Sequence, residues 1–182
     1  MADLSAATGI WDIDPTHSTI GFSARHAMIA KVRGRFAEFT GSITMDGANP
    51  AASKADLTIV AASITTENDD RDAHLRTAEF LDVEQFPTIT FASTGVVANG
   101  SSFTVTGDLT IRGVTRPVDV QWELIGIGQD PWGNTRLGFE GTAEISRKEF
   151  GLTWNVALEA GGVLVSDNVQ LLLDVEAVKR AG

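Results

Sequence analysis

The chain has no cysteine and no tyrosine, and it has three histidines among 182 residues. Without cysteine there can be no disulfide bonds, thiol catalysis or thiolate metal sites. The sequence also lacks any run of ~18 or more consecutive apolar residues, which is the minimum for a membrane-spanning helix. We therefore expect no stable membrane insertion.

Basic residues are scarce as well. Lysine and arginine total 14 against 24 aspartates and glutamates, so the formal net charge is -10. Binding to nucleic acid depends on many contacts from lysine and arginine to phosphates, so we expect no nucleic-acid partner. The same charge would repel an anionic membrane surface.

Residues 1–9 carry neither a basic leader nor an apolar run long enough for a secretory signal. The sequence as it stands predicts a cytoplasmic protein. A periplasmic or secreted location would follow if a leader had been removed.

Apolar and polar residues alternate with a period of two along most of the chain, which is typical of strands with one buried face. In 102–111, Phe103, Val105, Leu109 and Ile111 share one face. Similar runs predict about eight to ten strands, which are expected to close into a barrel or a two-layer sandwich so that no edges are exposed. The phase of one run shifts between Phe36 and Phe39, as at a β-bulge. The other runs are 10–14, 19–25, 33–45, 56–61, 88–93, 118–124, 136–145 and 169–177.

Helical signals are confined to short segments. Asn68 is a good N-cap with acidic residues after it, and it predicts a helix from about Asn68 to about Phe80. A second short helical turn is expected at His26 to Val32. We expect a disordered segment at 1–8, one barrel domain at 9–178 and a tail at 179–182.

Catalytic motifs are missing. No Gly-x-Ser-x-Gly elbow occurs, so we assign no catalytic residue. Asp69, Asp70, Asp72 and His74 crowd one segment, but helical spacing places only Asp70 and His74 on one face. Since a zinc site needs about three or four ligands, we interpret this segment as an acidic helix start and expect neither a metal nor a cofactor.

The remaining feature of the sequence is its abundance of large apolar side chains. The chain has nine phenylalanines and four tryptophans, many of them on the apolar faces of the alternating runs. A barrel of about eight strands is either filled by side chains or holds one small ligand. Composition leaves both alternatives open.

Eight blocks of the sequence follow one another in order across Gly9 to Ala177. They are Trp11–Phe22, Arg25–His26, Gly34–Phe36, Arg71–Leu75, Glu79–Pro87, Ile89–Phe91, Gly107–Val118 and Ile145–Leu152. Together these blocks resemble the YceI-like proteins, a lipocalin-like family that binds polyisoprenoids. The resemblance implies an all-β fold, an extended antiparallel β-barrel of about eight strands with one or two short helices. It also implies a long apolar lumen for a polyprenyl phosphate or an isoprenoid quinone.

The candidate ligand-binding residues fall into two groups. Apolar candidates for the lumen are Phe22, Phe36, Phe39, Leu57, Ile59, Phe80, Phe91, Phe103, Val105, Trp122 and Phe139. Polar candidates for a head group at the mouth are His17, His26, Arg71, His74 and Arg147.

Three functions are compatible with such a lumen. The first is binding, storage or transport of an isoprenoid-type lipid. The second is broad scavenging of amphipathic small molecules in a stress response, and the third is an enzyme acting on a bound lipid through a lumen histidine. The expected partner is the apolar lipid, and we consider a homodimer as the oligomeric state.

Overall fold

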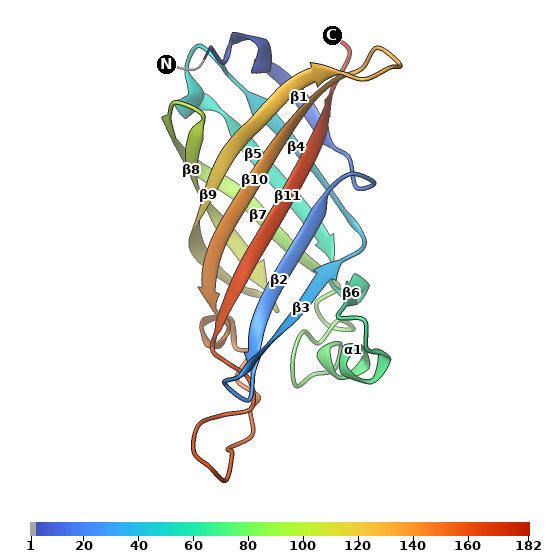
Figure 1. Ribbon diagram of the computed structural model, residues 1–182, viewed down its shortest axis with the longest axis vertical. Coiled ribbons are helices and arrows are strands. Elements are labelled where there is room, and N and C mark those ends of the chain that lie inside the picture. Colours follow the sequence, from blue (N-terminus) through green and yellow to red (C-terminus); the bar gives the residue numbers. More distant parts are fainter. Residues whose placement is uncertain (1–2) are drawn as a thin grey trace.

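Eleven β-strands and one α-helix make up the computed structural model, which describes residues 3–182 (Figure 1). The strands are β1 (Gly9–Ile13), β2 (Thr19–His26), β3 (Ala30–Phe36), β4 (Phe39–Met45), β5 (Lys54–Val60), β6 (Ile64–Thr65), β7 (Thr88–Asn99), β8 (Ser102–Ile111), β9 (Val114–Gln129), β10 (Thr135–Ser146) and β11 (Asn168–Lys179). The helix is α1 (Asp69–Leu75), and short 3₁₀ helices lie at Ser5–Ala7, Pro50–Ala52, Ala61–Ser63 and Arg147–Phe150.

The strands close into a barrel. Each strand pairs antiparallel with its neighbours in the order β1, β4, β5, β7, β8, β9, β10 and β11, and β11 pairs back to β1. This closed circuit of eight strands confirms the barrel predicted from the alternation and excludes the sandwich. Among residues 3–182, no helix is both long enough and apolar enough to cross a membrane.

At three positions in the barrel wall, one strand is interrupted and a second strand continues beside the same neighbour. β10 occupies one edge of β11 along 168–178, so β1 and β2 both lie on the other edge, where β1 pairs with 177–179 and β2 with 170–174. β3 and β4 form a second interrupted pair. The predicted bulge between Phe36 and Phe39 is in fact this break, because Ala37 and Glu38 turn their amides to Ser63. β5 and β6 are separated in the same way by Ala61–Ser63.

The upper end of the barrel, at the top of Figure 1, carries the 3₁₀ helix Ser5–Ala7 and the C-terminus. We expected disorder over residues 1–8, but in the described part, 3–8, Ser5–Ala7 forms a 3₁₀ helix and Ala7 is fully buried. Trp11 holds it there through a 2.8 Å hydrogen bond from its indole nitrogen to the carbonyl oxygen of Ala7. Residues 1–2 lie outside the described residues. The expected tail also starts later, since β11 includes Lys179.

The lower end carries α1 (Figure 1). The Asn68 side chain caps the helix by accepting a hydrogen bond from the amide of Arg71, as predicted. The helix ends at Leu75, however, and not near Phe80. With about 100° per residue, a continued helix would place Phe80 and Leu81 roughly 140° and 240° away from Leu75. The tight turns that follow instead let all three side chains pack at the lower end of the barrel.

The expected helical turn at His26 to Val32 is wrong. β2 and β3 form a hairpin there, closed by a 3.0 Å hydrogen bond from the amide of Ile29 to the carbonyl oxygen of His26. Arg25 pairs with Lys31 in the antiparallel ladder. The segment therefore forms a hairpin turn and the start of β3, and no helix.

Candidate ligand-binding cavity

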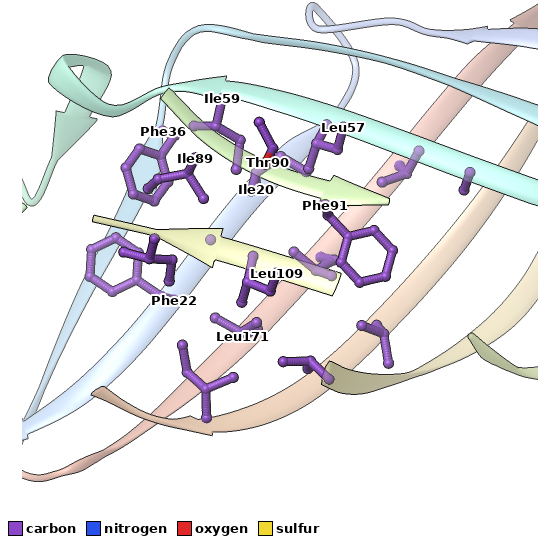
Figure 2. Close-up of a pocket in the computed structure, with 18 of the residues that line it drawn as sticks. Ile20, Phe22, Phe36, Leu57, Ile59, Ile89, Thr90, Phe91, Leu109 and Leu171 are labelled. Carbon is purple, nitrogen blue, oxygen red and sulfur yellow. The ribbon is translucent and has the colours of Figure 1, made fainter. Parts of the chain in front are cut away.

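The barrel encloses an elongated apolar cavity. Its volume is about 300 Å³, at the lower end of the ~300–1,000 Å³ usual for ligand sites. Figure 2 shows its wall, where side chains from β2, β3, β5, β7, β8 and β11 converge. The labelled residues are Ile20, Phe22, Phe36, Leu57, Ile59, Ile89, Thr90, Phe91, Leu109 and Leu171.

The cavity follows the long axis of the barrel. Phe103 and Ile111 both line it and lie at opposite ends of β8. At ~3.4 Å per residue they are about 27 Å apart along the strand, which corresponds to about 20 Å along the axis for a strand tilted by ~35–45°. A space of this shape suits an extended chain better than a compact molecule.

Glycines in the wall let aromatic rings lie flat. Gly34 is the ladder partner of Phe22, and a Cβ atom at Gly34 would lie 2.4 Å from that ring. Gly141 is the partner of Trp122, where the corresponding distance is 2.5 Å. Because each ring occupies the space that a neighbouring side chain would fill, it covers the wall and leaves the axis of the barrel open.

The upper end of the cavity is closed by aromatic packing. The ring of Phe139 meets Phe103 edge-on at 5.8 Å between centroids, and it meets Trp122 at 6.2 Å. Trp11 and Leu137, both fully or almost fully buried, pack in the same cluster above them. An apolar chain therefore meets a wall of rings at this end.

At the lower end, Arg147 is buried and lines the cavity. Its guanidinium donates hydrogen bonds to the carbonyl oxygens of Leu152, Trp154, Val165 and Ser166 at 2.7–3.2 Å. Burial lowers the pKa of this guanidinium, while the charge of Asp167 acts in the opposite direction. Arg147 thus holds the segment between β10 and β11 in place beneath the cavity. Four of its five N–H groups donate these hydrogen bonds.

A model of the YceI-like domain matches residues 11–177. The chain belongs to the YceI-like family. It is 43% identical over 169 residues to a UPF0312 protein of Pseudomonas aeruginosa, covering 93% of this chain and 85% of that protein. It is 40% identical to Protein YceI of Escherichia coli O6:H1 over the same shares of both chains.

Solved structures share the YceI-like architecture. BcnA of Burkholderia cenocepacia superposes with a TM-score of 0.78 at 24% identity, covering 90% of this chain and 98% of that one. The YCEI protein of Campylobacter jejuni gives 0.74 at 30% identity, covering 86% and 90%. A polyisoprenoid binding domain from Saccharophagus degradans gives 0.72 at 16% identity, covering 93% and 98%.

Most of the residues proposed from the sequence surround this YceI-like cavity. Those that line it are Phe22, Phe36, Leu57, Ile59, Phe80, Phe91, Phe103, Val105, Trp122, Phe139 and Arg147. Phe39 does not line it but is buried in the adjoining core. The binding role of each of these residues stays a prediction.

The other polar candidates lie outside the cavity. His17 sits on the outer surface at the break between β1 and β2, where its Nδ1 atom is 2.8 Å from Asp14. Arg71 donates from Nε and Nη2 to Thr66, so it fastens the start of α1. His26 ends β2 and bridges to Val165 at the lower end.

His74 is placed differently. It projects from α1 into an aromatic cluster, edge-on to Phe80 at 5.0 Å and to Trp154 at 4.7 Å, and its Nε2 atom contacts Glu79. It therefore packs beneath Phe80, one residue away from the cavity. Of the five polar candidates only Arg147 reaches the lumen.

Sequence reasoning missed several residues that line the lower part of the cavity. Leu152 and Val165 come from the irregular segment between β10 and β11, which has no periodic pattern. Leu75 and Leu81 flank the helix end that was misplaced. A period of two identifies wall residues only inside strands, so it gave no signal here.

One further cluster has the composition of a metal site. Side-chain ligand atoms of Asp14, His17 and Glu176 lie within 4.8 Å of one another. Nη1 of Arg136 already binds Asp14 at 2.8 Å and Glu176 at 2.7 Å. The guanidinium thus occupies the position that a cation would take, and the cluster is an ion-pair network.

Proposed function

We propose that this protein binds a long isoprenoid-type lipid, either a polyprenyl phosphate or an isoprenoid quinone, inside the barrel and stores or transports it. The observation that carries the proposal is the elongated cavity inside the barrel, with its almost wholly apolar wall. The polyisoprenoid-binding description of the Saccharophagus degradans domain, which shares the fold, supports it.

The energetics favour a long chain over a short one. Burial of each methylene contributes roughly 0.8 kcal/mol, so a five-carbon prenyl unit contributes about 4 kcal/mol before costs. Association itself costs an estimated ~4–15 kcal/mol. One unit therefore barely compensates for this cost, whereas several units bind tightly without any polar contact. Selection should follow chain length and girth more than the head group.

A broad scavenger of amphipathic small molecules is the second candidate. The apolar wall favours it, because few hydrogen-bonding groups are available to discriminate between guests. Competition separates the two functions. A carrier should release a bound isoprenoid quinone to other prenyl lipids only, while a scavenger should also release it to unrelated apolar dyes.

We infer binding in preference to catalysis. None of the three histidines, His17, His26 and His74, lines the cavity, so none is placed to exchange a proton with a guest there. A variant with all three replaced by glutamine should keep full lipid binding. Loss of a lipid-converting activity in that variant would favour the enzymatic alternative.

The decisive experiment is extraction of the purified protein with organic solvent, followed by mass spectrometry of the extract. We expect one prenyl lipid per barrel. Gly141→Val, which drives the Trp122 ring toward the axis, should yield a protein with clearly less bound lipid. Wild-type protein that is lipid-free from several hosts and takes up no added prenyl quinone would refute the proposal.

A further inference from the structure

Two segments far apart in the sequence meet below the barrel. The β2–β3 hairpin and the loop 155–165 are joined by a 2.7 Å hydrogen bond from the amide of Ala27 to the carbonyl oxygen of Leu164 and by the bridge between His26 and Val165. Figure 1 shows the loop projecting beyond the lower end of the strands, next to the hairpin. They form one protrusion.

This protrusion carries exposed apolar side chains. The exposed fractions are 57% for Met28, 80% for Ile29, 46% for Val156 and 37% for Val163. We call these four residues the apolar tip. Large apolar side chains gathered at a projecting end mark a surface that meets a partner or a membrane.

The backbone of the hairpin supports a role for the tip. Ala27 and Met28, the two central residues of the turn, have φ of 51° and 62°. Such left-handed conformations strongly favour glycine, asparagine or aspartate. Met28 nevertheless occupies a position at which glycine would adopt the same backbone conformation with less strain. Strain of this kind is concentrated at functional sites.

A line of cations follows the tip along the outside of the hairpin. Arg25, Lys31, Arg33 and Arg35 are exposed, and the register places Arg25 opposite Lys31 on the outer face. We call these four residues the basic stripe. Residues 15–37 include no aspartate or glutamate, although the whole chain has a net charge of -10. The hairpin strands therefore carry a local positive charge, opposite in sign to the net charge of the molecule.

Acidic residues also lie at this end of the barrel, Asp69 and Asp70 on α1 among them, but among the described residues only Glu67 forms an ion pair with the stripe. Glu67 lies 3.9 Å from Arg35, and both side chains are largely exposed, so the pair is weak. Glu159 lies in the loop and is exposed. The remaining cations face solvent at the end of the molecule where the apolar tip projects.

The tip adjoins the cavity. Val165, which bridges to His26, also lines the cavity, and so does Ala24 on β2. Arg147 holds the loop in place through its bond to the carbonyl oxygen of Val165. A guest entering or leaving between the hairpin and the loop would thus pass directly from the tip into the lumen.

We propose that the apolar tip and the basic stripe dock on an anionic phospholipid surface, so that lipid passes between the membrane and the cavity at this end. The inference rests on the proposed lipid-binding function and adds the site of exchange. Docking is peripheral: the tip enters the interface, while the cations meet the anionic head groups.

The opposite end offers the main rival surface. Trp132, 81% exposed, lies in the β9–β10 turn at the upper end (Figure 1). That turn is organised by Asp130, and the cavity is closed there by the cluster around Trp11. Since the rings of Phe103 and Phe139 close the cavity on this side, this end does not fit exchange.

The test is flotation of the protein with vesicles of phosphatidylcholine alone and with vesicles that also contain phosphatidylglycerol. We expect at least tenfold stronger binding to the anionic vesicles, falling as salt is raised. Met28→Gly with Ile29→Ser should lower binding about tenfold or more. Arg33→Gln with Arg35→Gln should lower it by about 25-fold, since each cation near an anionic surface contributes roughly fivefold. Trp132→Ser is the matched control and should change binding less than twofold.

Three results would overturn the inference: wild-type protein that binds neither kind of vesicle, tip variants that bind like wild type, or a Trp132→Ser variant that loses as much. The first would leave the tip as a site for another protein. Solvent extraction of the same variants separates this question from the proposed function. Normal lipid content with lost flotation supports docking, whereas flotation of a barrel that never holds lipid would refute the proposed function alone.

Discussion

Single glycines control the position of the aromatic rings in the cavity wall. A Cβ atom at Gly141 would lie 2.5–2.7 Å from atoms of the Trp122 indole, which is rigid. A larger side chain must therefore push the ring toward the barrel axis, where a guest would lie. The openness of the lumen thus depends on residues that have no side chain.

Gly141→Val should weaken binding of a prenyl quinone at least tenfold and destabilise the fold by about 1–3 kcal/mol, as overpacking does. Titration of the quinone against intrinsic tryptophan fluorescence measures the first effect and urea unfolding the second. Gly126→Val is the control, because a Cβ atom at Gly126 has no neighbour within 4 Å. Adding Trp122→Leu to Gly141→Val should restore binding. Full affinity in Gly141→Val would contradict the account of the wall.

Arg147→Met should loosen the segment between β10 and β11. It leaves the carbonyl oxygens of Leu152, Trp154 and Ser166 without the donor that Arg147 supplies. The carbonyl oxygen of Val165 keeps its hydrogen bond from the Asn155 side chain. We expect a loss of about 2–4 kcal/mol in unfolding free energy, since an abandoned buried carbonyl such as that of Leu152 costs ~1–3 kcal/mol and the two part-buried ones cost less. Amide hydrogen exchange should accelerate in 152–166 and stay unchanged in β8. Lys148→Met, an exposed neighbour, is the control, and equal protection in both variants would exclude the fastening role.

The alternation of residues predicted the wall of the cavity well and its lower end poorly. Phe103, Val105 and Trp122 could be assigned to the lumen because a strand turns every second residue to the same face. The partners of Arg147 could not be found, since they are backbone carbonyls of a loop brought near by the closure of the barrel. His17 looked like a mouth residue, but the break between β1 and β2 turns it outward.

At the scale of elements, ion pairs join neighbouring strands of the barrel at the break between β1 and β2. Arg136 on β10 binds Asp14 at the end of β1, Asp130 in the β9–β10 turn and Glu176 on β11, all at 2.7–2.8 Å. The bonds from His17 and Arg136 hold the pKa of Asp14 well below its usual range, and Arg136 does the same to Asp130. One cation thus joins the break between β1 and β2 to the strands beside it.

This network predicts sensitivity to acid. A carboxyl group whose pKa is lower in the folded state stabilises the fold above its ordinary pKa of ~3.9, and that contribution is lost as the pH falls further. Stability should therefore drop from about pH 5 downward. In Arg136→Gln the protein should be less stable at pH 7 and its stability should fall less steeply in acid.

Urea midpoints at pH 7, 5 and 3.5 measure both effects. Arg33→Gln removes an exposed cation from β3 and should leave the acid slope as it is in the wild type. Parallel pH profiles for wild type and Arg136→Gln would show that the network contributes nothing to acid stability.

The connection after β5 shows a different limit of sequence reasoning. The N-cap at Asn68 was visible because an asparagine before acidic residues is a local signal. The end at Leu75 was not, because it depends on Phe80 and Leu81 reaching the core of a barrel that the local sequence does not describe.

For the molecule as a whole, the two ends of the barrel differ. The upper end is closed by the N-terminal segment, Trp11 and the rings of Phe103 and Phe139. The lower end combines the cavity's one buried guanidinium, Arg147, with the loop and the hairpin that form the apolar tip. Under the proposed function, a guest would enter from below and stop at the rings, so the distance between the two ends would set the length of chain that fits.

Replacing an aromatic side chain at the upper end of the cavity by a smaller one should therefore favour binding of a longer guest. Phe103→Ala removes a buried side chain that lines the cavity, at a cost of about 3–5 kcal/mol in stability, and it extends the lumen toward Trp11. Offered a mixture of prenyl quinones, this variant should retain a distribution longer by at least one prenyl unit, as read by mass spectrometry of the extract. Leu137→Ala is the matched control, because Leu137 is equally buried in the same cluster but does not line the cavity. If the control shifts the distribution as much, or if Phe103→Ala leaves it unchanged, the aromatic rings do not determine the length of the bound chain. That length must then be selected at the lower end of the cavity.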